Sequence, residues 1–244
     1  MVDEGPSQPY NSMIRELVRR HATLNRIRKF VRFVQSVPPT ELLSSRTRAA
    51  FRVRSKTLLD YGRLAAIHEV ASAAPPGAFV ECGVWAGGSA GMMSLADPAR
   101  HLWLFDSWQG LPEPGDRDIS FQGHRRHAGW NHAERPQVEH FLLEKLGLDP
   151  KLVHLVQGWF DETLPTARME IGPIALMHLD GDWYASIRTC LEVLYDAVVP
   201  GGFVVVDDYF HWQGCAQAVD GFLASREPVE LKRVGVAAWW RIGG

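Results

Sequence analysis

The 244-residue sequence has few cysteines, no long apolar run and almost no net charge. Its three cysteines form no CxxC pair, so nothing indicates a disulfide framework or an oxidising compartment. No stretch approaches the roughly 18 apolar residues of a membrane-spanning helix, and the first residues lack the basic and apolar regions of a signal peptide. A net charge of −2 argues against a domain that binds nucleic acid or membranes. We therefore expect a cytoplasmic protein without such partners.

Several catalytic signatures are also missing. The sequence has no GxSxG nucleophile elbow, and the histidines of the polar segment 111–136 lack a zinc-binding spacing. A complete GxGxxG fingerprint is absent as well, because Trp85 stands two positions after Gly83, where the second glycine would be. An NAD-dependent oxidoreductase is therefore disfavoured, although it stays an alternative on the same fold.

The charge is unevenly distributed along the chain. Residues 1–60 hold 12 Lys and Arg against 5 Asp and Glu, which leaves a net charge of −9 on the remainder. Apolar residues at three- and four-residue spacing between Met13 and Val34 predict an amphipathic helix that ends at Pro38, and a second helical segment follows from about Glu41 towards Ala74. We predict an N-terminal helical arm over residues 1–56, used for subunit packing or lid closure in a homo-oligomer, and a catalytic domain over 57–244.

From Pro75 onward, short apolar segments alternate with helical ones, which predicts an α/β fold. We expect a Rossmann-like, mostly parallel sheet with helices on both faces. The expected strands lie within 77–84, 101–108, 152–159, 173–184 and 201–209, with one or two more in the tail, and the expected helices at 87–97, 137–147, 184–197 and 213–225. The polar insert 111–136 is long enough to be a lid.

The carboxyl ends of parallel strands share one crevice, where ligands bind in folds of this kind. A glycine-rich turn that includes Gly83 follows the first expected strand, and Asp106 ends the second, where it can accept hydrogen bonds from a ribose. This pair favours an adenosine ligand without a pyrophosphate. The alternative is a tight strand–helix turn with a helix-capping acid.

Three aspartates end the next two expected strands. Asp180 follows one strand, and Asp207 and Asp208 follow the other about 25 residues later, so the three carboxylates can meet. Hard oxygen ligands of this kind suit Mg²⁺. Asp182 can then stay outside the metal shell as a base, and His211 can face the same site. The alternative for each acid is a helix cap or a surface turn.

In these motifs, the chain resembles the macrocin O-methyltransferase (TylF) family. The resemblance rests on the segments FVECGVWAGGSA, LFDSWQGLPEP, QGWFDETLP, HLDGDWYAS and PGGFVVVDDYFHWQGCAQAVDGF. Members are class I enzymes that use S-adenosylmethionine and Mg²⁺ to methylate sugar hydroxyls of natural products. The first 50 residues and the lid match the family loosely, so the resemblance says least about the acceptor.

The resemblance implies a role for each motif residue. The implied cofactor-binding residues are Glu81, Gly83, Val84, Ser89, Asp106, Ser107, Gly158, Trp159 and Asp180. The implied metal ligands are Asp180, Asp207 and Asp208, with Asp182 as the general base. Tyr209, His211 and His127 are candidates for contact with the acceptor. We expect methyl transfer to a glycosylated small molecule; the alternatives are a catechol-like acceptor or a non-catalytic subunit that binds an adenosine ligand.

Overall fold

The computed structural model describes residues 27–28 and 30–243, and the chain divides into two compact units, Met1–Leu42 and Leu43–Gly244. In the first unit, residues 27–28 and 30–36 are helical, and the short 3₁₀ helix η1 (Pro39–Glu41) follows. The expected end of this helix before Pro38 is confirmed. The positions from Met13 to Leu24 of the expected helix lie outside the described residues. The arm boundary at residue 56 stays a prediction.

The second unit begins with two helices rather than one. Helix α2 (Ser45–Val53) runs into the 3₁₀ helix η2 (Arg54–Lys56), and α3 (Tyr61–Ala73) starts after an extended stretch. Each α-helix has its own N-cap, because the Ser44 hydroxyl accepts from the Thr47 amide and the Asp60 carboxylate accepts from the Arg63 amide. The single helical segment expected from about Glu41 towards Ala74 is therefore wrong: the chain becomes extended at Thr57, and Asp60 then caps the start of a new helix.

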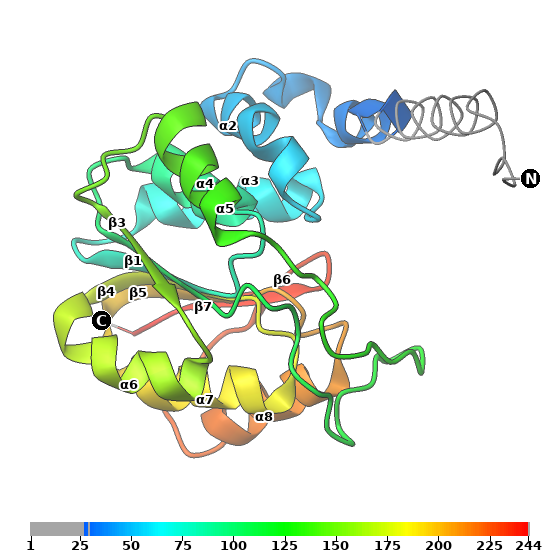
Figure 1. The fold of residues 1–244 in the computed structure, drawn as a ribbon, viewed down its shortest axis with the longest axis vertical. Helices are drawn as coiled ribbons and strands as arrows, with labels where there is room; N and C mark the ends of the chain where they lie inside the picture. The colour runs from blue at the N-terminus through cyan, green and yellow to red at the C-terminus, as the bar shows by residue number, and fades with distance from the viewer. Residues whose placement is uncertain (1–26, 29, 244) are drawn as a thin grey trace, which may run out of the picture. The chain divides into compact units, whose positions relative to one another are not determined.

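A seven-stranded sheet, in the order β3-β2-β1-β4-β5-β7-β6, forms the centre of this unit (Figure 1). The strands are β1 (Ala78–Cys82), β2 (Leu102–Asp106), β3 (Val153–Gln157), β4 (Ile174–Leu179), β5 (Val198–Val206), β6 (Lys232–Val234) and β7 (Ala237–Arg241). The first five pair in parallel, and β7 lies antiparallel between β5 and β6. The strand order reverses between β1 and β4, which is where ligands bind in open α/β sheets. All five parallel strands and the two in the tail are confirmed.

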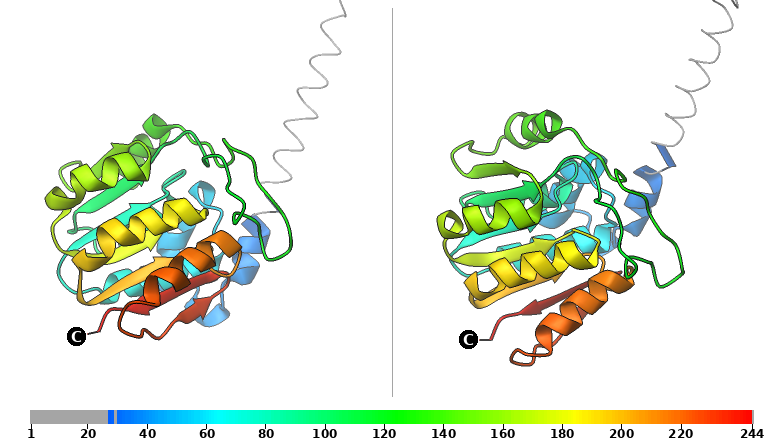
Figure 2. Two further views of the ribbon diagram at one scale, coloured as in Figure 1. Left: turned by 90° about the horizontal axis from the view of Figure 1, so that it is seen from below. Right: turned by 60° about the horizontal axis from the view of Figure 1, so that its bottom comes forward.

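Helices cover both faces of the sheet, as expected. Figure 1 shows α2, α3, α4 and α5 over one face and α6, α7 and α8 over the other, and α7 and α8 run side by side in Figure 2. Their bounds are α4 (Gly88–Ala96), α5 (Arg135–His140) with the π-helical turn η3 (Phe141–Lys145), α6 (Phe160–Ile171), α7 (Tyr184–Leu194) with η4 (Tyr195–Ala197), and α8 (Gln213–Leu223). Helix α6 was not among the expected helices, and it contains Pro165 in its interior.

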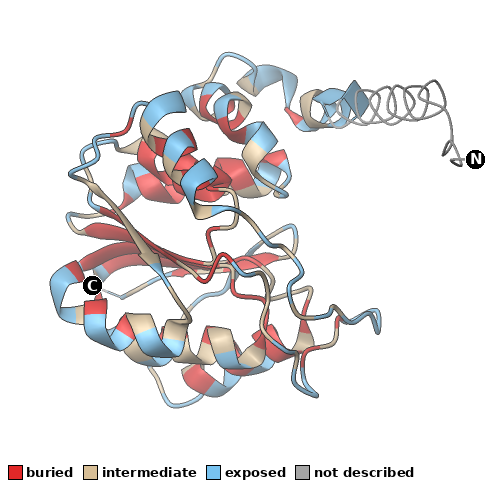
Figure 3. Cartoon of the chain, viewed as in Figure 1, coloured by how far each residue is buried: buried red, intermediate tan, exposed pale blue. Residues whose placement is uncertain are grey.

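The core lies between these layers. Strands β1 and β4 are buried along their whole length, in keeping with central strands covered on both sides (Figure 3). Trp183 and Trp240 are the largest of the fully buried side chains in the described part of the chain. Within the same residues, no helix combines the length and the apolar character that crossing a membrane requires.

Candidate active site

A cavity of about 640 Å³ opens at the carboxyl ends of β1, β2, β4 and β5. This volume is typical of small-molecule sites. Segment 56–59 and parts of the lid complete its wall. The structure brings most of the predicted site residues to this cavity: Gly83, Val84, Ser89, Asp106, Ser107, Gly158, Trp159, Asp180, Asp182, Asp207, Asp208 and His211.

The glycine turn after β1 has a backbone shape that a side chain would prevent. Gly83 has a φ of 93°, and a Cβ atom there would lie 2.1 Å from the carbonyl oxygen of Asp180. Trp85 also adopts a positive φ, of 46°. The Asp106 carboxylate stabilises this turn, because its Oδ2 accepts hydrogen bonds from the amides of Val84 (2.7 Å) and Trp85 (2.8 Å).

Asp106 therefore has a second task besides the predicted one. Its Oδ1 accepts a bond of 2.6 Å from the Trp108 amide, so three backbone donors occupy the carboxylate. A carboxylate offers about four acceptor positions, which leaves room for one further donor from a ligand. The ribose contact stays a prediction, and the turn-stabilising contacts were missed because they depend on amides about 20 residues upstream.

The three aspartates at the ends of β4 and β5 form one cluster. One ligand atom from each of Asp180, Asp207 and Asp208 lies within 4.8 Å of the others. Burial, together with mutual repulsion, raises the pKa of Asp180 well above its usual value and that of Asp207 to about 6. A divalent cation among the three would remove this repulsion.

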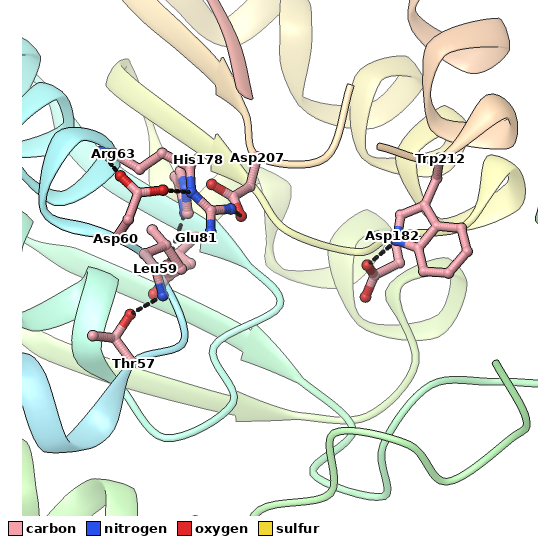
Figure 4. A network of polar contacts seen from close by, with 9 residues as sticks. All are labelled: Thr57, Leu59, Asp60, Arg63, Glu81, His178, Asp182, Asp207 and Trp212. Atoms are coloured by element: carbon pink, nitrogen blue, oxygen red, sulfur yellow. Dashed lines mark hydrogen bonds and ion pairs between the residues drawn. The ribbon is translucent and has the colours of Figure 1, made fainter. Parts of the chain in front are cut away.

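Arg63 of α3 holds one side of this cluster. Its guanidinium donates to Asp207 Oδ2 at 2.6 Å, while Asp60 accepts from the Arg63 Nε at 3.1 Å (Figure 4). The other oxygen of Asp207, Oδ1, is buried and has no hydrogen-bond partner. An orphaned carboxylate oxygen beside two other carboxylates is the arrangement that a hard cation such as Mg²⁺ needs, so the residues fit the predicted metal.

Asp182 is not one of the three clustered acids, but it lines the same cavity and its side chain contacts Asp208 through a hydrogen bond. It is only 7% exposed, and it has a positive φ of 56°. Its Oδ1 accepts a 2.7 Å hydrogen bond from the indole Nε1 of Trp212 (Figure 4). Burial, and next the negative charge of Asp208, raises the pKa of Asp182 well above its usual value. A carboxylate of raised pKa at the cavity wall suits proton transfer.

Three of the predicted residues do not line the cavity. Glu81 is fully buried within β1, and its Oε1 pairs with His178 Nδ1 of the neighbouring strand at 2.8 Å. The Tyr209 hydroxyl donates to Asp220 at 2.6 Å, and the His127 ring bonds the carbonyl of the next residue. The physical reason is the same for each: the side chain already has a partner that holds it away from the cavity wall. The other ring nitrogen of His178, Nε2, is buried and has no hydrogen-bond partner.

The lid, residues 111–136, has an anchored stem and an exposed tip. In the stem, Ser120 forms an antiparallel bridge with Trp212, and Asp118 Oδ1 accepts from the Tyr184 amide at the start of α7 (2.8 Å). We call the mostly exposed residues 121–130 the tip; there Arg126 and Trp130 line the cavity, with the Arg126 guanidinium 4.7 Å from the centroid of the Trp130 ring. The Trp130 carbonyl accepts a hydrogen bond from the Leu111 amide, which ties the end of the tip to the start of the lid. Figure 2 shows this lid as the long green loop.

Sequence reasoning missed part of the cavity wall. Those residues are Lys56, Thr57, Leu58, Leu59, Arg63, Arg126, Trp130 and Trp212. Trp212 belongs to a motif that carried the resemblance, so that motif was the signal available for it. For Arg63 no such signal existed, since its partner in the cluster, Asp207, is 144 residues away.

The strand order, the helices on both faces and the cavity at the strand ends define a Rossmann-like fold of the class I methyltransferase type. Within that class, the macrocin-O-methyltransferase (TylF) family matches residues 52–242, and the chain belongs to this family. The expected family is therefore confirmed.

Individual relatives agree with this assignment. The chain is 37% identical, over 68% of its length, to a tetracenomycin-C rhamnosyl 4'-O-methyltransferase of Streptomyces olivaceus; the match spans 66% of that protein, slightly less than two thirds. The solved structure of the O-methyltransferase NovP is 31% identical, with a TM-score of 0.67 over 78% of this chain and 83% of NovP. The mycinamycin-pathway methyltransferase MycE, solved with Mg, SAH and mycinamycin VI, is alike in fold alone: 18% identity and a TM-score of 0.54 over 82% of this chain and 54% of MycE.

Proposed function

We propose that this protein transfers a methyl group from S-adenosylmethionine to a hydroxyl of a sugar on a natural product, with Mg²⁺ bound by three aspartates. The observation that carries the proposal is the buried oxygen without a partner on Asp207, a residue that clusters with two other aspartates and lines the same cavity as Asp182. The relatives support the reaction class, because the S. olivaceus protein is named for methylation of a rhamnosyl group and MycE was solved with Mg and SAH.

The chain's own residues divide the work between two ends of the cavity. At the cofactor end, the turn held by Asp106 presents the backbone of Gly83 and Val84, and Ser107 lines the same region. At the metal end, Asp180, Asp207 and Asp208 would hold the cation, and Arg63 fixes Asp207 by its other oxygen. Mg²⁺, when bound there, would lower the pKa of an acceptor hydroxyl and orient it.

Asp182 would take the proton of that hydroxyl. The hydroxyl oxygen attacks the methyl carbon, the bond from carbon to sulfur breaks with its electron pair going to sulfur, and the proton passes to Asp182. Because the sulfonium is already activated, the remaining task of the protein is placement, worth up to about 7–11 kcal/mol in ideal cases. The lid tip, with Arg126 and Trp130, would cover the acceptor and exclude water.

A catechol-like acceptor remains the second candidate, because two neighbouring hydroxyls on a ring also suit a metal site. A non-catalytic adenosine-binding subunit would need neither the acid cluster nor Asp182. The decisive assay measures S-adenosylhomocysteine formed from S-adenosylmethionine with glycosylated and catechol acceptors, with Mg²⁺ or with EDTA. We expect turnover with the glycosylated acceptor that EDTA abolishes. No turnover with either acceptor, together with tight binding of S-adenosylmethionine, would indicate the non-catalytic subunit.

The N-terminal arm, residues 1–56, would serve the assembly of a homo-oligomer in the cytoplasm. Residues 1–60 carry a charge of +7 and the rest of the chain −9, so attraction between copies is available. Deleting residues 1–40 should lower the number of copies in the assembly, as measured by sedimentation equilibrium. If the truncated protein kept both the same number of copies and its activity, the arm would be dispensable.

A further inference from the structure

The hydrogen bond between Trp212 and Asp182 joins two loops that are 30 residues apart in the chain. Asp182 lies between β4 and α7, and Trp212 lies just before α8. Both side chains are buried, at 7% and 3% exposure, so water does not replace either partner. A short bond to a carboxylate under such conditions is stronger than one between neutral groups.

The indole is itself held in place on several sides. Its ring packs edge-on against Trp183, with centroids 4.9 Å apart, and against His211, with centroids 4.7 Å apart. Its backbone forms the bridge to Ser120 in the lid stem. The indole Nε1 therefore has little freedom to move away from the carboxylate.

Asp182 needs such a partner because its backbone alone does not fix the carboxylate. Its positive φ is a conformation that costs an L-residue free energy, and Asp tolerates it better than most. The carboxylate can still rotate about its own side-chain bonds. The Trp212 indole donates to Oδ1 and restricts that rotation, and the other hydrogen-bond contact of this side chain is with Asp208 of the acid cluster.

We propose that Trp212 is a positioning residue that holds the Asp182 carboxylate in place to receive the proton of the acceptor hydroxyl. This inference rests on the proposed function, in which Asp182 is the base. Because the Trp212 backbone also pairs with the lid stem, the same residue keeps the base in register with the loop that covers the acceptor. Trp212 touches Asp182 and lines the cavity, but it does not exchange the proton.

The test is Trp212→Phe, which keeps an aromatic ring and removes the donor. We expect kcat to fall about 10- to 100-fold, the range that loss of a hydrogen bond to a charged group produces, with the Kd values for S-adenosylmethionine and Mg²⁺ changed less than threefold. Trp240→Phe is the matched control, because Trp240 is fully buried in β7 and donates only a long 3.4 Å hydrogen bond, to Tyr195. Trp240 does not line the cavity. The control variant should leave kcat unchanged.

An independent readout does not need turnover. The protein has nine tryptophans, so ¹⁵N-labelled indoles give up to nine N–H signals. The signal that Trp212→Phe removes should be shifted downfield in the wild-type protein, and Asp182→Asn should move that same signal upfield. If the chemical shift of this signal did not change in Asp182→Asn, the inference about Trp212 would be overturned. The same holds if Trp212→Phe kept the wild-type kcat while Asp182→Asn was inactive. If Asp182→Asn itself keeps full turnover, the proposed function of Asp182 fails instead.

Discussion

The two walls of the cavity are built in different ways. The strand-end wall consists of Gly83, Asp106 and the three aspartates of the cluster, each at or just after the end of a parallel strand. The peripheral wall consists of segment 56–59, Arg63 and the lid residues 111–112, 126 and 130–131. The first wall is fixed by the sheet, whereas the second depends on loops and on side chains that reach in from a distance.

This difference suggests a division of labour. The carboxyl ends of parallel strands meet at one edge of the sheet, so the positions of the residues that bind a ligand there follow from the sheet itself. That sheet is common to all proteins of this fold. The lid tip belongs to the part of the chain whose sequence resembled the family least, and surface loops vary more than strands. We therefore expect the strand-end wall to set the chemistry and the peripheral wall to set the acceptor.

The largest effect should come from Asp182→Asn, which keeps the shape of the side chain and removes its basicity. Loss of a general base lowers kcat by about 10²- to 10⁴-fold, and metal affinity should stay nearly intact, because Asp182 lies outside the cluster. Asp180→Asn should instead weaken metal binding first and recover in part at millimolar Mg²⁺. Calorimetric titration with Mg²⁺ checks both. If Asp182→Asn lost the metal and Asp180→Asn kept it, the two roles would have to be exchanged.

A pair of variants separates the two walls directly. Asp106→Ala removes the acceptor of three backbone amides and the predicted ribose contact, so the Kd for S-adenosylmethionine should rise about 10- to 150-fold. Arg126→Ala, in the peripheral wall, should raise the KM for the acceptor and leave the cofactor Kd unchanged. If Asp106→Ala left the Kd for S-adenosylmethionine unchanged, or if Arg126→Ala raised it, the proposed difference between the two walls would be contradicted.

The same contrast explains what the sequence could predict. The parallel strands and the acids at their ends follow from apolar runs that stop at Asp106, Asp180 and Asp207, because the strand end fixes where the next residue lies. Glu81 is the exception that shows the limit: it is near a strand end, but its side chain points to His178 within the sheet. The direction of a side chain depends on its neighbour in space, which a single sequence does not show.

Contacts over long sequence separations were equally out of reach. Arg63 binds Asp207, and the Trp212 indole binds Asp182, because helix α3 and the loop before α8 pack beside the strand ends. No local pattern encodes such a pairing. Helix α6 was not among the expected helices, although it contains Pro165, a residue that usually disrupts a helix interior.

The acid cluster also predicts how stability depends on pH. The pKa of Asp207 is raised to about 6 in the folded protein, so the folded state binds the proton more tightly than the unfolded chain does. Without metal, this group should therefore make the protein more stable as the pH falls from 7 towards 4, by at most about 3 kcal/mol. Urea denaturation in EDTA, compared with Asp207→Asn, isolates this contribution. Saturating Mg²⁺ at pH 7 should restore the free energy of unfolding that the repulsion removes. If Asp207→Asn showed the same dependence of stability on pH as the wild type, the idea of repulsion within the acid cluster would be contradicted.

The smallest effect concerns the lid stem, where the peripheral wall meets the sheet. Asp118 is 4% exposed; its Oδ1 accepts from the Tyr184 amide and its Oδ2 from the Gly115 amide, so it caps α7 from the lid. Asp118→Ala should lower the free energy of unfolding by about 0.5–2 kcal/mol, the usual cost of losing a helix cap, and speed proteolysis within residues 111–136. Asp116→Ala changes an exposed aspartate of the same loop and should do neither.

In the wild-type protein, S-adenosylhomocysteine plus acceptor should slow cleavage at the tip far more than in the stem, because Trp183 and the residues around Trp212 already bond the stem to the body of the domain. If the ligands slowed cleavage equally in the tip and in the stem, the whole lid would move as one unit. The stem would then not be the fixed part that positions the lid residues of the peripheral wall.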